Sequence, residues 1–242
     1  MELRPYQNEA VNAIFNQWNS GFKNTLLVLP TGTGKTVVFS KVVEEEVKDG
    51  SKALILAHRG ELLDQASDKL KLASGLDSAL EKAESTSIGS PLNVTVASVQ
   101  TLSQEKRLAR FPRDYFKTIV VDEAHHSMSE TYQRILQHFD AARVLGVTAT
   151  PDRADQKNLG QFFNSKAYEY SMHQAVKEGF LCPVRAQMIP LELDIHSVGM
   201  SNGDYAVGEI GGALEPYLNK IAIEMVNYCK GRKTVVFLPL VK

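Results

Sequence analysis

The sequence has 242 residues, of which 43% are hydrophobic and 23% are charged, a balance typical of a folded globular protein and not of a disordered, fibrous or coiled-coil chain. The 27 basic and 28 acidic side chains give a net charge of −1, so any polyanion partner would have to be held by local patches or backbone amides and not by bulk charge. No apolar run approaches the roughly 20 residues of a membrane-spanning helix, so no membrane partner is expected.

Short apolar runs alternate with amphipathic stretches along the chain. The runs are nearly continuous, as in strands of a parallel sheet that is covered on both faces. The predicted strands are residues 25–29, 53–57, 94–98, 118–121, 144–147, 185–190 and 234–238. The predicted helices are residues 7–18, 36–48, 61–71, 129–139, 173–178 and 216–228. This alternation predicts an α/β fold with an open, mainly parallel sheet flanked by helices.

Two segments are predicted to be loops. Residues 85–91 form a turn cluster, and the glycine-rich residues 197–212 indicate a long mobile connection. A domain boundary is expected near Cys182-Pro183, which gives a first domain over residues 1–183 and the beginning of a second, incomplete domain over residues 184–242.

The ends and the cysteines of the chain bear on its compartment. Charges stand early in the sequence with no apolar segment behind them, so no secretory signal is expected. Cys182 and Cys229 belong to no CxxC or Cys/His spacing, which disfavours a disulfide scaffold or a zinc module and fits a reducing compartment. We therefore expect a cytoplasmic protein.

The segment LPTGTGKT, residues 29–36, runs from a predicted strand into a predicted helix. Its glycines allow backbone amides to approach a phosphate, and the helix N-terminus attracts the same anion. Lys35 would reach the outer phosphates, and the Thr36 hydroxyl would bind Mg²⁺. The strict phosphate-loop pattern has glycine where Leu29 stands, and the alternative interpretation is a plain tight turn. The residues expected to contact the nucleotide here are Thr31, Gly32, Thr33, Gly34, Lys35 and Thr36.

Acidic residues follow the apolar run at 118–121. Because the carboxyl ends of parallel strands are where such sheets bind ligands, Asp122 is expected to hold Mg²⁺ through water and Glu123 to orient or deprotonate an attacking water. An acidic pair at a strand end is also common without function. A metal pair at His125-His126 is disfavoured because adjacent side chains are expected to diverge and no HExxH pattern is present.

Thr148-Ala149-Thr150-Pro151 follows the next apolar run. The hydroxyls of Thr148 and Thr150 could bond to the segment that begins at Asp122. The alternative is a strand-terminating turn with no function.

Together these segments resemble the DEAD/DEAH-box superfamily 2 helicases, in the branch that includes restriction-enzyme motor subunits. Further matches are LRPYQ at residues 3–7, AHRGELLDQ at 57–65, ASVQTL at 97–102 and TVVF at 234–237. The resemblance implies a RecA-like P-loop NTPase domain that uses ATP and Mg²⁺. In that family the matching residues Gln7 and Arg4 read adenine, His125 belongs to the catalytic segment, and Thr148 and Thr150 couple the nucleotide site to movement.

The resemblance also implies a nucleic-acid strand on the other side of the domain, with Arg59, Ser98 and Thr101 on its phosphates. The alternatives are a solvated cation at a helix start for Arg59 and cap or turn hydroxyls for Ser98 and Thr101. Single-stranded or duplex nucleic acid is expected as partner, with DNA favoured over RNA because the form of residues 57–65 departs from that of RNA helicases.

The function implied is that of an ATP-dependent helicase or translocase, whose ATP hydrolysis drives movement along a strand. The alternatives are a remodeller of protein–DNA complexes that does not separate strands, a nucleotide-gated nucleic-acid-binding module, and a small-molecule kinase. The sequence contains no QxxGRxxR-like segment, which in the family supplies arginines to the transition state. We therefore expect this chain alone to bind ATP but to be nearly inactive in hydrolysis.

Overall fold

The computed structural model describes residues 2–57, 63–149, 159–186, 188, 198–201, 204–205 and 207–237. The chain divides into two compact units, Met1–Pro183 and Val184–Lys242. No helix in the described part of the chain is both long enough and apolar enough to cross a membrane.

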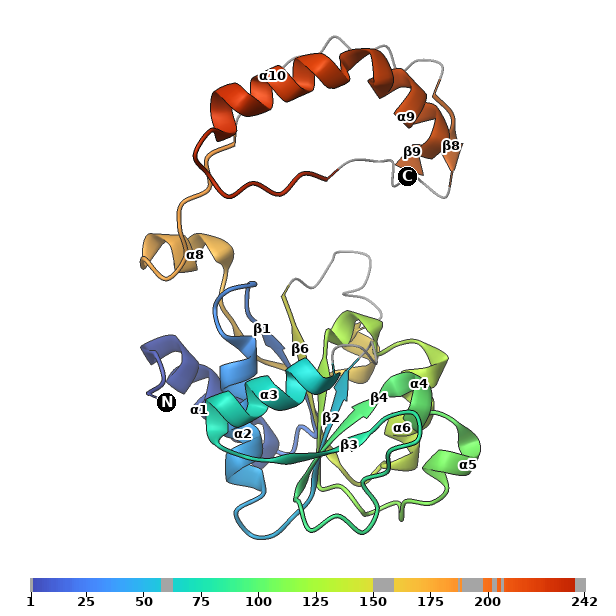
Figure 1. The fold of residues 1–242 in the computed structure, drawn as a ribbon. Coiled ribbons are helices and arrows are strands. Elements are labelled where there is room, and N and C mark those ends of the chain that lie inside the picture. Colours follow the sequence, from blue (N-terminus) through green and yellow to red (C-terminus); the bar gives the residue numbers. More distant parts are fainter. Residues whose placement is uncertain are drawn as a thin grey trace. The chain divides into compact units, whose positions relative to one another are not determined.

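The first unit is built on a seven-stranded sheet in which every pair of neighbours is parallel. Its strands, in chain order, are β1 (Asn24–Val28), β2 (Ala53–Ala57), β3 (Ser78–Glu81), β4 (Val94–Ser98), β5 (Thr118–Asp122), β6 (Arg143–Thr148) and β7 (Ser165–Glu169). Their order across the sheet is β3-β4-β2-β5-β6-β1-β7 (Figure 1). The α/β fold with a mainly parallel sheet is confirmed.

Helices cover both faces of this sheet. They are α1 (Pro5–Asn19), α2 (Lys35–Glu46), α3 (Leu63–Ser74), α4 (Val99–Leu102), α5 (Glu105–Leu108), α6 (Glu130–His138) and α8 (Met172–Lys177). Figure 1 shows α1, α2 and α3 on one side and α4, α5 and α6 on the other. A short 3₁₀ turn, η2 (Ala124–His126), follows β5.

The near-continuous apolar strands are explained by this double cover, because successive side chains point to opposite faces. In β2, Ile55 belongs to the core under α1, α2 and α3, whereas Leu54 and Leu56 belong to the core under α4, α5 and α6. The other central strands alternate in the same way. The five predicted strands of this unit all lie in the sheet, with bounds that differ by at most two residues.

The sequence missed the two edge strands, β3 and β7. Their sequences are SALE and SKAYE, and apart from the buried Glu81 their side chains are only partly covered or exposed. An edge strand needs no continuous apolar run, because solvent reaches it from one side. The prediction of a turn at residues 85–91 is confirmed, since the described backbone there contains only turns, bends and an isolated bridge.

The second unit contains the hairpin strands β8 (Met200–Ser201) and β9 (Asp204–Tyr205), the helix α9 (Val207–Leu214), the 3₁₀ turn η3 (Glu215–Tyr217) and the helix α10 (Leu218–Cys229). The predicted loop over residues 197–212 is therefore wrong in its described part. Its apolar residues at 207, 210 and 214 have helical spacing, and this pattern prevails over the helix-weakening effect of the glycines.

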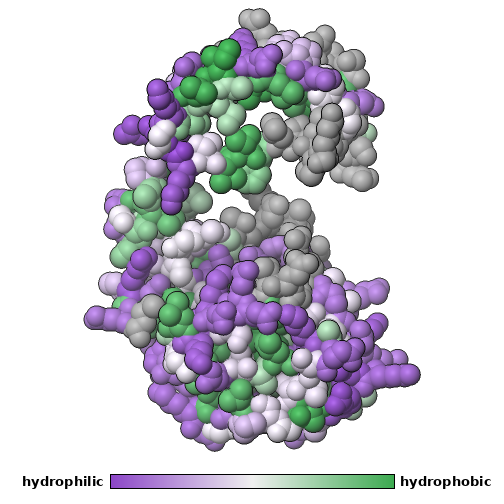
Figure 2. Space-filling model, viewed as in Figure 1, coloured by the Kyte–Doolittle hydropathy of each residue, from purple (hydrophilic) through white to green (hydrophobic). Residues whose placement is uncertain are grey.

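Two predicted strands of this unit are not formed where the structure describes them. Residues 185, 186 and 188 lie outside any strand, and so do residues 233–237. Phe237 is 91% exposed and Val235 is 78% exposed. Figure 2 shows apolar side chains on the surface of this unit, over α10. An apolar run forms a strand only when another strand pairs with it, and no partner for residues 233–237 occurs in the described segments.

The packing of β6 gives a test of the sheet. A Cβ on Gly146 would lie 2.4 Å from Cζ of Phe163 and 3.0 Å from Cδ1 of Leu26. Gly146→Ala should therefore destabilise the chain by about 1–3 kcal/mol, which urea unfolding would measure. Gly160→Ala is the matched control, because a Cβ there meets no described atom within 4 Å. Equal stability of the two variants would contradict the close approach.

Candidate nucleotide-binding site

Three loops meet at the carboxyl edge of the sheet because β6 lies between β5 and β1. In register, Asp122 pairs with Val147, and Val28 pairs with Thr148. The backbone N–H of Leu29 donates to the carbonyl of Thr148 at 3.1 Å. The segments after β1, β5 and β6, far apart in sequence, therefore begin side by side.

The loop between β1 and α2 has the backbone of an anion cradle. Gly32 and Gly34 have φ angles of +86° and +83°, in the left-handed region that favours glycine. Gly34 is the N-cap of α2 and offers no side-chain cap, so the amides of the first helical turn have no capping side chain. This geometry fits a phosphate at the helix N-terminus.

The N-terminus of α1 packs against the back of this loop. The carbonyl of Thr33 accepts two hydrogen bonds, from the Tyr6 hydroxyl at 2.7 Å and from Nε2 of Gln7 at 3.0 Å. A Cβ on Gly34 would lie 2.6 Å from the same Nε2, so a side chain at that position would displace the Gln7 amide, and the φ of +83° would strain it as well. Leu181 approaches Gly32, where an added Cβ would lie 3.0 Å from its Cδ2.

The loop residues divide by exposure. The Thr33 side chain is fully buried and its hydroxyl donates to the carbonyl of Pro30 at 2.6 Å, so this hydroxyl is engaged within the loop. Thr31 is exposed, whereas Lys35 is half-buried and its Nζ donates to the carbonyl of Leu29 at 3.4 Å. This long bond leaves Lys35 folded back over the loop, within reach of a phosphate held by the amides.

A pocket of about 200 Å³ lies beside the loop. It is lined by Thr36, Phe39, Ala57, Gln65, Ala66, Lys69, Asp122 and Glu123. Thr36 and Asp122 therefore line one space, as the predicted Mg²⁺ site requires. Hard oxygen ligands, one of them charged, fit an ion that retains most of its water.

Burial raises the pKa of Asp122, and the nearby Glu123 carboxylate raises it further. The backbone N–H of Glu123 donates to Oδ1 of Asp122 at 3.0 Å, and this bond together with Lys35 and Lys69 acts in the opposite direction. The Asp122 carboxylate is thus held in an unfavourable environment that a cation would relieve. Burial and the same two carboxylates also raise the pKa of Tyr132.

Glu123 is one of two described non-glycine residues with positive φ, at +53°. Such strain persists where the surrounding structure holds the backbone in place, and it often marks a functional site. Glu123 lines the pocket, and its Oε2 lies 3.6 Å from Nδ1 of His125.

The argument that His125 and His126 diverge is wrong. Their ring centroids lie 4.1 Å apart at an angle of 48°, because the 3₁₀ turn η2 brings the side chains together. No group of three or more potential metal ligands occurs among the described residues, however.

The predicted adenine-reading residues lie at the start of α1. Gln7 is 4% exposed, and its Oε1 accepts from the backbone N–H of Arg4 at 2.9 Å. An amide group has two donors and two acceptor lone pairs, so one of each remains on Gln7 for a ligand. The Arg4 guanidinium lies over the Phe180 ring, 5.2 Å from its centroid, and Nη1 donates to the Tyr6 hydroxyl at 3.2 Å.

The predicted nucleic-acid contacts are less well defined. Arg59 lies outside the described residues, as does the coupling residue Thr150. Ser98 is 4% exposed, and its hydroxyl donates to Oε1 of Gln100 at 2.9 Å. The Thr101 hydroxyl accepts from the backbone N–H of Ala83 at 3.4 Å. Both hydroxyls have partners within the protein, as the turn interpretation expects, and their contacts with nucleic acid stay predictions.

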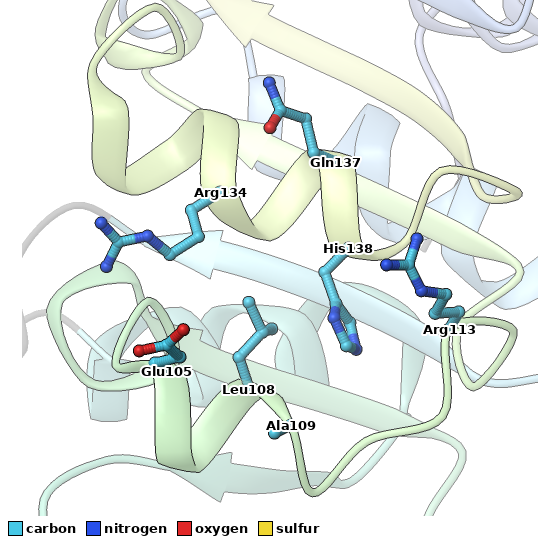
Figure 3. Close-up of a pocket in the computed structure, with 7 residues that line it drawn as sticks. All are labelled: Glu105, Leu108, Ala109, Arg113, Arg134, Gln137 and His138. Atoms are coloured by element: carbon cyan, nitrogen blue, oxygen red, sulfur yellow. The ribbon is translucent and has the colours of Figure 1, made fainter.

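A larger cavity of about 330 Å³ lies elsewhere, between α5, α6 and the loop after α5. Its arginines, Arg113 and Arg134, extend toward opposite ends of the cavity (Figure 3). They do not converge on one ligand, and no predicted site residue lines this space. The strand-end edge is therefore the better candidate for the functional site.

Comparison with known proteins identifies the family. Residues 1–153 match the family described as the res subunit of type III restriction enzymes. The chain belongs to this family. The prediction from the motifs is confirmed at this level.

Named relatives point the same way. The chain is 30% identical over 248 residues to the candidate ATP-dependent helicase IRC3 of Saccharomyces cerevisiae, covering 96% of this chain and 36% of IRC3. It is 32% identical over 158 residues to the DNA 3'-5' translocase XPB2 of Sulfurisphaera tokodaii, covering 65% of this chain and 33% of XPB2. The chain thus spans about a third of the length of these relatives.

A solved structure is also similar. A fragment of a candidate HsdR subunit of a type I restriction enzyme from Vibrio vulnificus YJ016 superposes with a TM-score of 0.56 and 26% identity, over 73% of this chain and 32% of that chain. The superposition places the sheet of the first unit among the RecA-like folds of these enzymes.

Two residues near the site were not predicted. Tyr6 is a buried residue within the LRPYQ match, and Lys69 is one of several charged residues on the amphipathic helix α3. The LRPYQ match could have drawn attention to Tyr6. No local signal distinguishes Lys69, because only the packing of α3 against α2 makes it line the pocket.

The raised pKa of Asp122 gives a test by pH. The folded state binds this proton more tightly than the unfolded state, so the ionised carboxylate lowers stability at neutral pH. Asp122→Asn should therefore raise the melting temperature of the nucleotide-free chain by a few degrees at neutral pH. The gain should vanish as the pH falls toward the ordinary aspartate value of 3.8. A loss of stability at neutral pH would contradict the assigned environment.

Proposed function

We propose that this chain is the ATP-binding part of an ATP-dependent nucleic-acid motor, a helicase or translocase. The proposal depends mainly on one observation, which is that an anion-binding loop and an acidic pair lie beside each other at the same edge of the sheet. A glycine-shaped anion cradle after β1 opens beside the Asp122–Glu123 pair after β5, with Thr36 and both carboxylates lining one pocket. Membership in the restriction-subunit family and the similarity to a named DNA translocase support the same function.

The residues have distinct tasks in this proposal. Backbone amides around Gly34 and the N-terminus of α2 bind the phosphates, and Lys35 neutralises their outer charge. Thr36 and Asp122 would hold Mg²⁺, which supplies charge stabilisation to the transferring phosphoryl group. Glu123 positions the attacking water, with His125 beside it, and Gln7 and Arg4 select adenine.

We further propose DNA as the track, on which Arg59, Ser98 and Thr101 would contact phosphates. The resemblance to XPB2, named as a DNA translocase, favours DNA over RNA. Residues 1–183 would form the first motor domain and residues 184–242 the start of the second. The similarity to IRC3 supports this division because it covers 96% of the chain and so extends past the first unit.

Strand separation and translocation without separation require the same residues, so a strand-displacement assay on a protein containing both motor domains decides between them. We also propose a reducing, cytoplasmic location. Cys182 and Cys229 are both free thiols, which agrees with that compartment.

Nucleotide binding tests the cradle. Lys35→Ala should weaken binding of a fluorescent ADP analogue with Mg²⁺ by at least about tenfold, since a charge-assisted contact to phosphate is lost. Lys41→Ala is the matched control, because Lys41 lies on the same helix and pairs with Glu44 and Glu45. Unchanged affinity in Lys35→Ala would remove the assignment of the phosphate loop. Displacement of the probe by GTP as effectively as by ATP would remove the role of Gln7.

Turnover tests the role of Glu123. In a protein with both motor domains, Glu123→Gln should keep nucleotide affinity but lower DNA-stimulated phosphate release by about 10²-fold or more, because a water-positioning carboxylate is lost. The 242-residue chain alone should release phosphate slowly with or without DNA. Rapid turnover by the chain alone would show that the arginine expected from the second domain is not required.

A further inference from the structure

The peptide between Thr33 and Gly34 is held unusually firmly for a loop. Its carbonyl accepts from both the Tyr6 hydroxyl and Nε2 of Gln7, at 2.7 and 3.0 Å. Both donors are buried, at 3% and 4% exposure, and both come from the first turn of α1. Two lone pairs are thus occupied, and this carbonyl has no remaining capacity to turn toward a ligand.

The direction of this carbonyl fixes the direction of an amide. In a trans peptide the C=O and N–H bonds are antiparallel, and the unit is rigid. Because the Thr33 carbonyl points toward Tyr6 and Gln7 of α1, the N–H of Gly34 points away from α1. A flipped peptide would present an oxygen to the phosphate instead, and would repel it.

Tyr6 is itself held by residues outside every recognised motif. Its ring stacks on Tyr170 with centroids 4.4 Å apart and an interplanar angle of 8°. Phe180 meets the Tyr6 ring edge-on at 4.9 Å. The Tyr170 hydroxyl donates to Oε2 of Glu178 at 2.7 Å, and this bond joins the residues that precede and follow α8.

The same stretch touches the loop directly. Leu181, one residue after Phe180, is the side chain nearest to Gly32. Residues 170–181 therefore contact the loop through Leu181 and, indirectly, through Tyr6. The second unit begins at Val184, three residues further along the chain.

We propose that Tyr6, Tyr170 and Phe180 are positioning residues that lock the Thr33–Gly34 peptide in its anion-binding orientation and tie nucleotide binding to residues 170–181. The proposal rests on the proposed nucleotide site and adds residues that no motif assigns. The Tyr6 hydroxyl acts on the peptide, and Tyr170 and Phe180 act by fixing the Tyr6 ring. Because coupling is reciprocal, a bound nucleotide should in turn order residues 170–181.

The first experiment removes single hydroxyls. Tyr6→Phe keeps the stacked ring and deletes the bond to the Thr33 carbonyl together with the longer bond from Nη1 of Arg4, so affinity for a fluorescent ADP analogue with Mg²⁺ should fall roughly three- to tenfold. Tyr168→Phe is the matched control, because it deletes a hydroxyl that donates to Glu9 of the same helix α1 and leaves affinity unchanged. Tyr170→Leu should weaken binding as well, through the lost stack.

The second measurement is hydrogen exchange. A purely structural role of Tyr6 would not change how much MgADP protects residues 172–181. In the wild-type chain, MgADP should slow hydrogen exchange of the backbone amides at 172–181. In Tyr6→Phe at saturating MgADP this protection should be smaller, whereas in Tyr168→Phe it should match the wild type. Melting temperatures without nucleotide show whether each variant folds, and Tyr6→Phe decides the question if Tyr170→Leu does not fold.

The outcomes separate two failures. If the wild-type chain does not bind MgADP, the proposed nucleotide site is wrong and this inference falls with it. If the wild type binds and Tyr6→Phe binds equally well, the nucleotide site stands and the positioning role is overturned. Equal exchange protection in Tyr6→Phe and the wild type would overturn the tie to residues 170–181.

Discussion

The parallel register of β5, β6 and β1 determines where every candidate site residue of the first unit can lie. Parallel strands end at one edge, and β6 between the other two sets the spacing of the phosphate loop from the acidic pair. Asp122 stands opposite Val147, and Leu29 bonds to Thr148, so a shift of one residue would separate the groups. The two apolar cores fix that register, since each strand must present alternate side chains to both. The positions of the binding residues at the carboxyl edge of the sheet thus depend on the packing of the two apolar cores.

The sequence was most informative where one local signal was sufficient. Near-continuous apolar runs identified the five central strands, and glycine spacing identified the cradle before Lys35 and Thr36. The acidic pair at 122–123 could be placed near them because a parallel α/β sheet brings strand ends together. These inferences use only chain order and burial, which a sequence encodes directly.

Other features depend on partners distant in sequence and could not be read locally. The edge strands β3 and β7 have mixed composition, and their pairing with β4 and β1 is what makes them strands. Lys69 gains its place from the packing of α3. The Thr33 carbonyl is bonded by a residue 27 positions away, which no loop motif records. In the second unit, the apolar run at 234–237 predicted a strand. A strand forms only when a neighbouring strand pairs with its backbone N–H and C=O groups, and the apolar pattern does not show whether such a neighbour exists.

Two different requirements meet at Glu123, one from its left-handed backbone and one from its proposed role. Its φ of +53° suits glycine or asparagine, whereas the proposed chemistry requires a carboxylate. Replacement by glycine would relax the backbone while sparing the cradle, Thr36 and Asp122. Under the proposed function, selection for heat resistance alone would therefore drift toward a folded protein that still captures nucleotide and no longer turns it over.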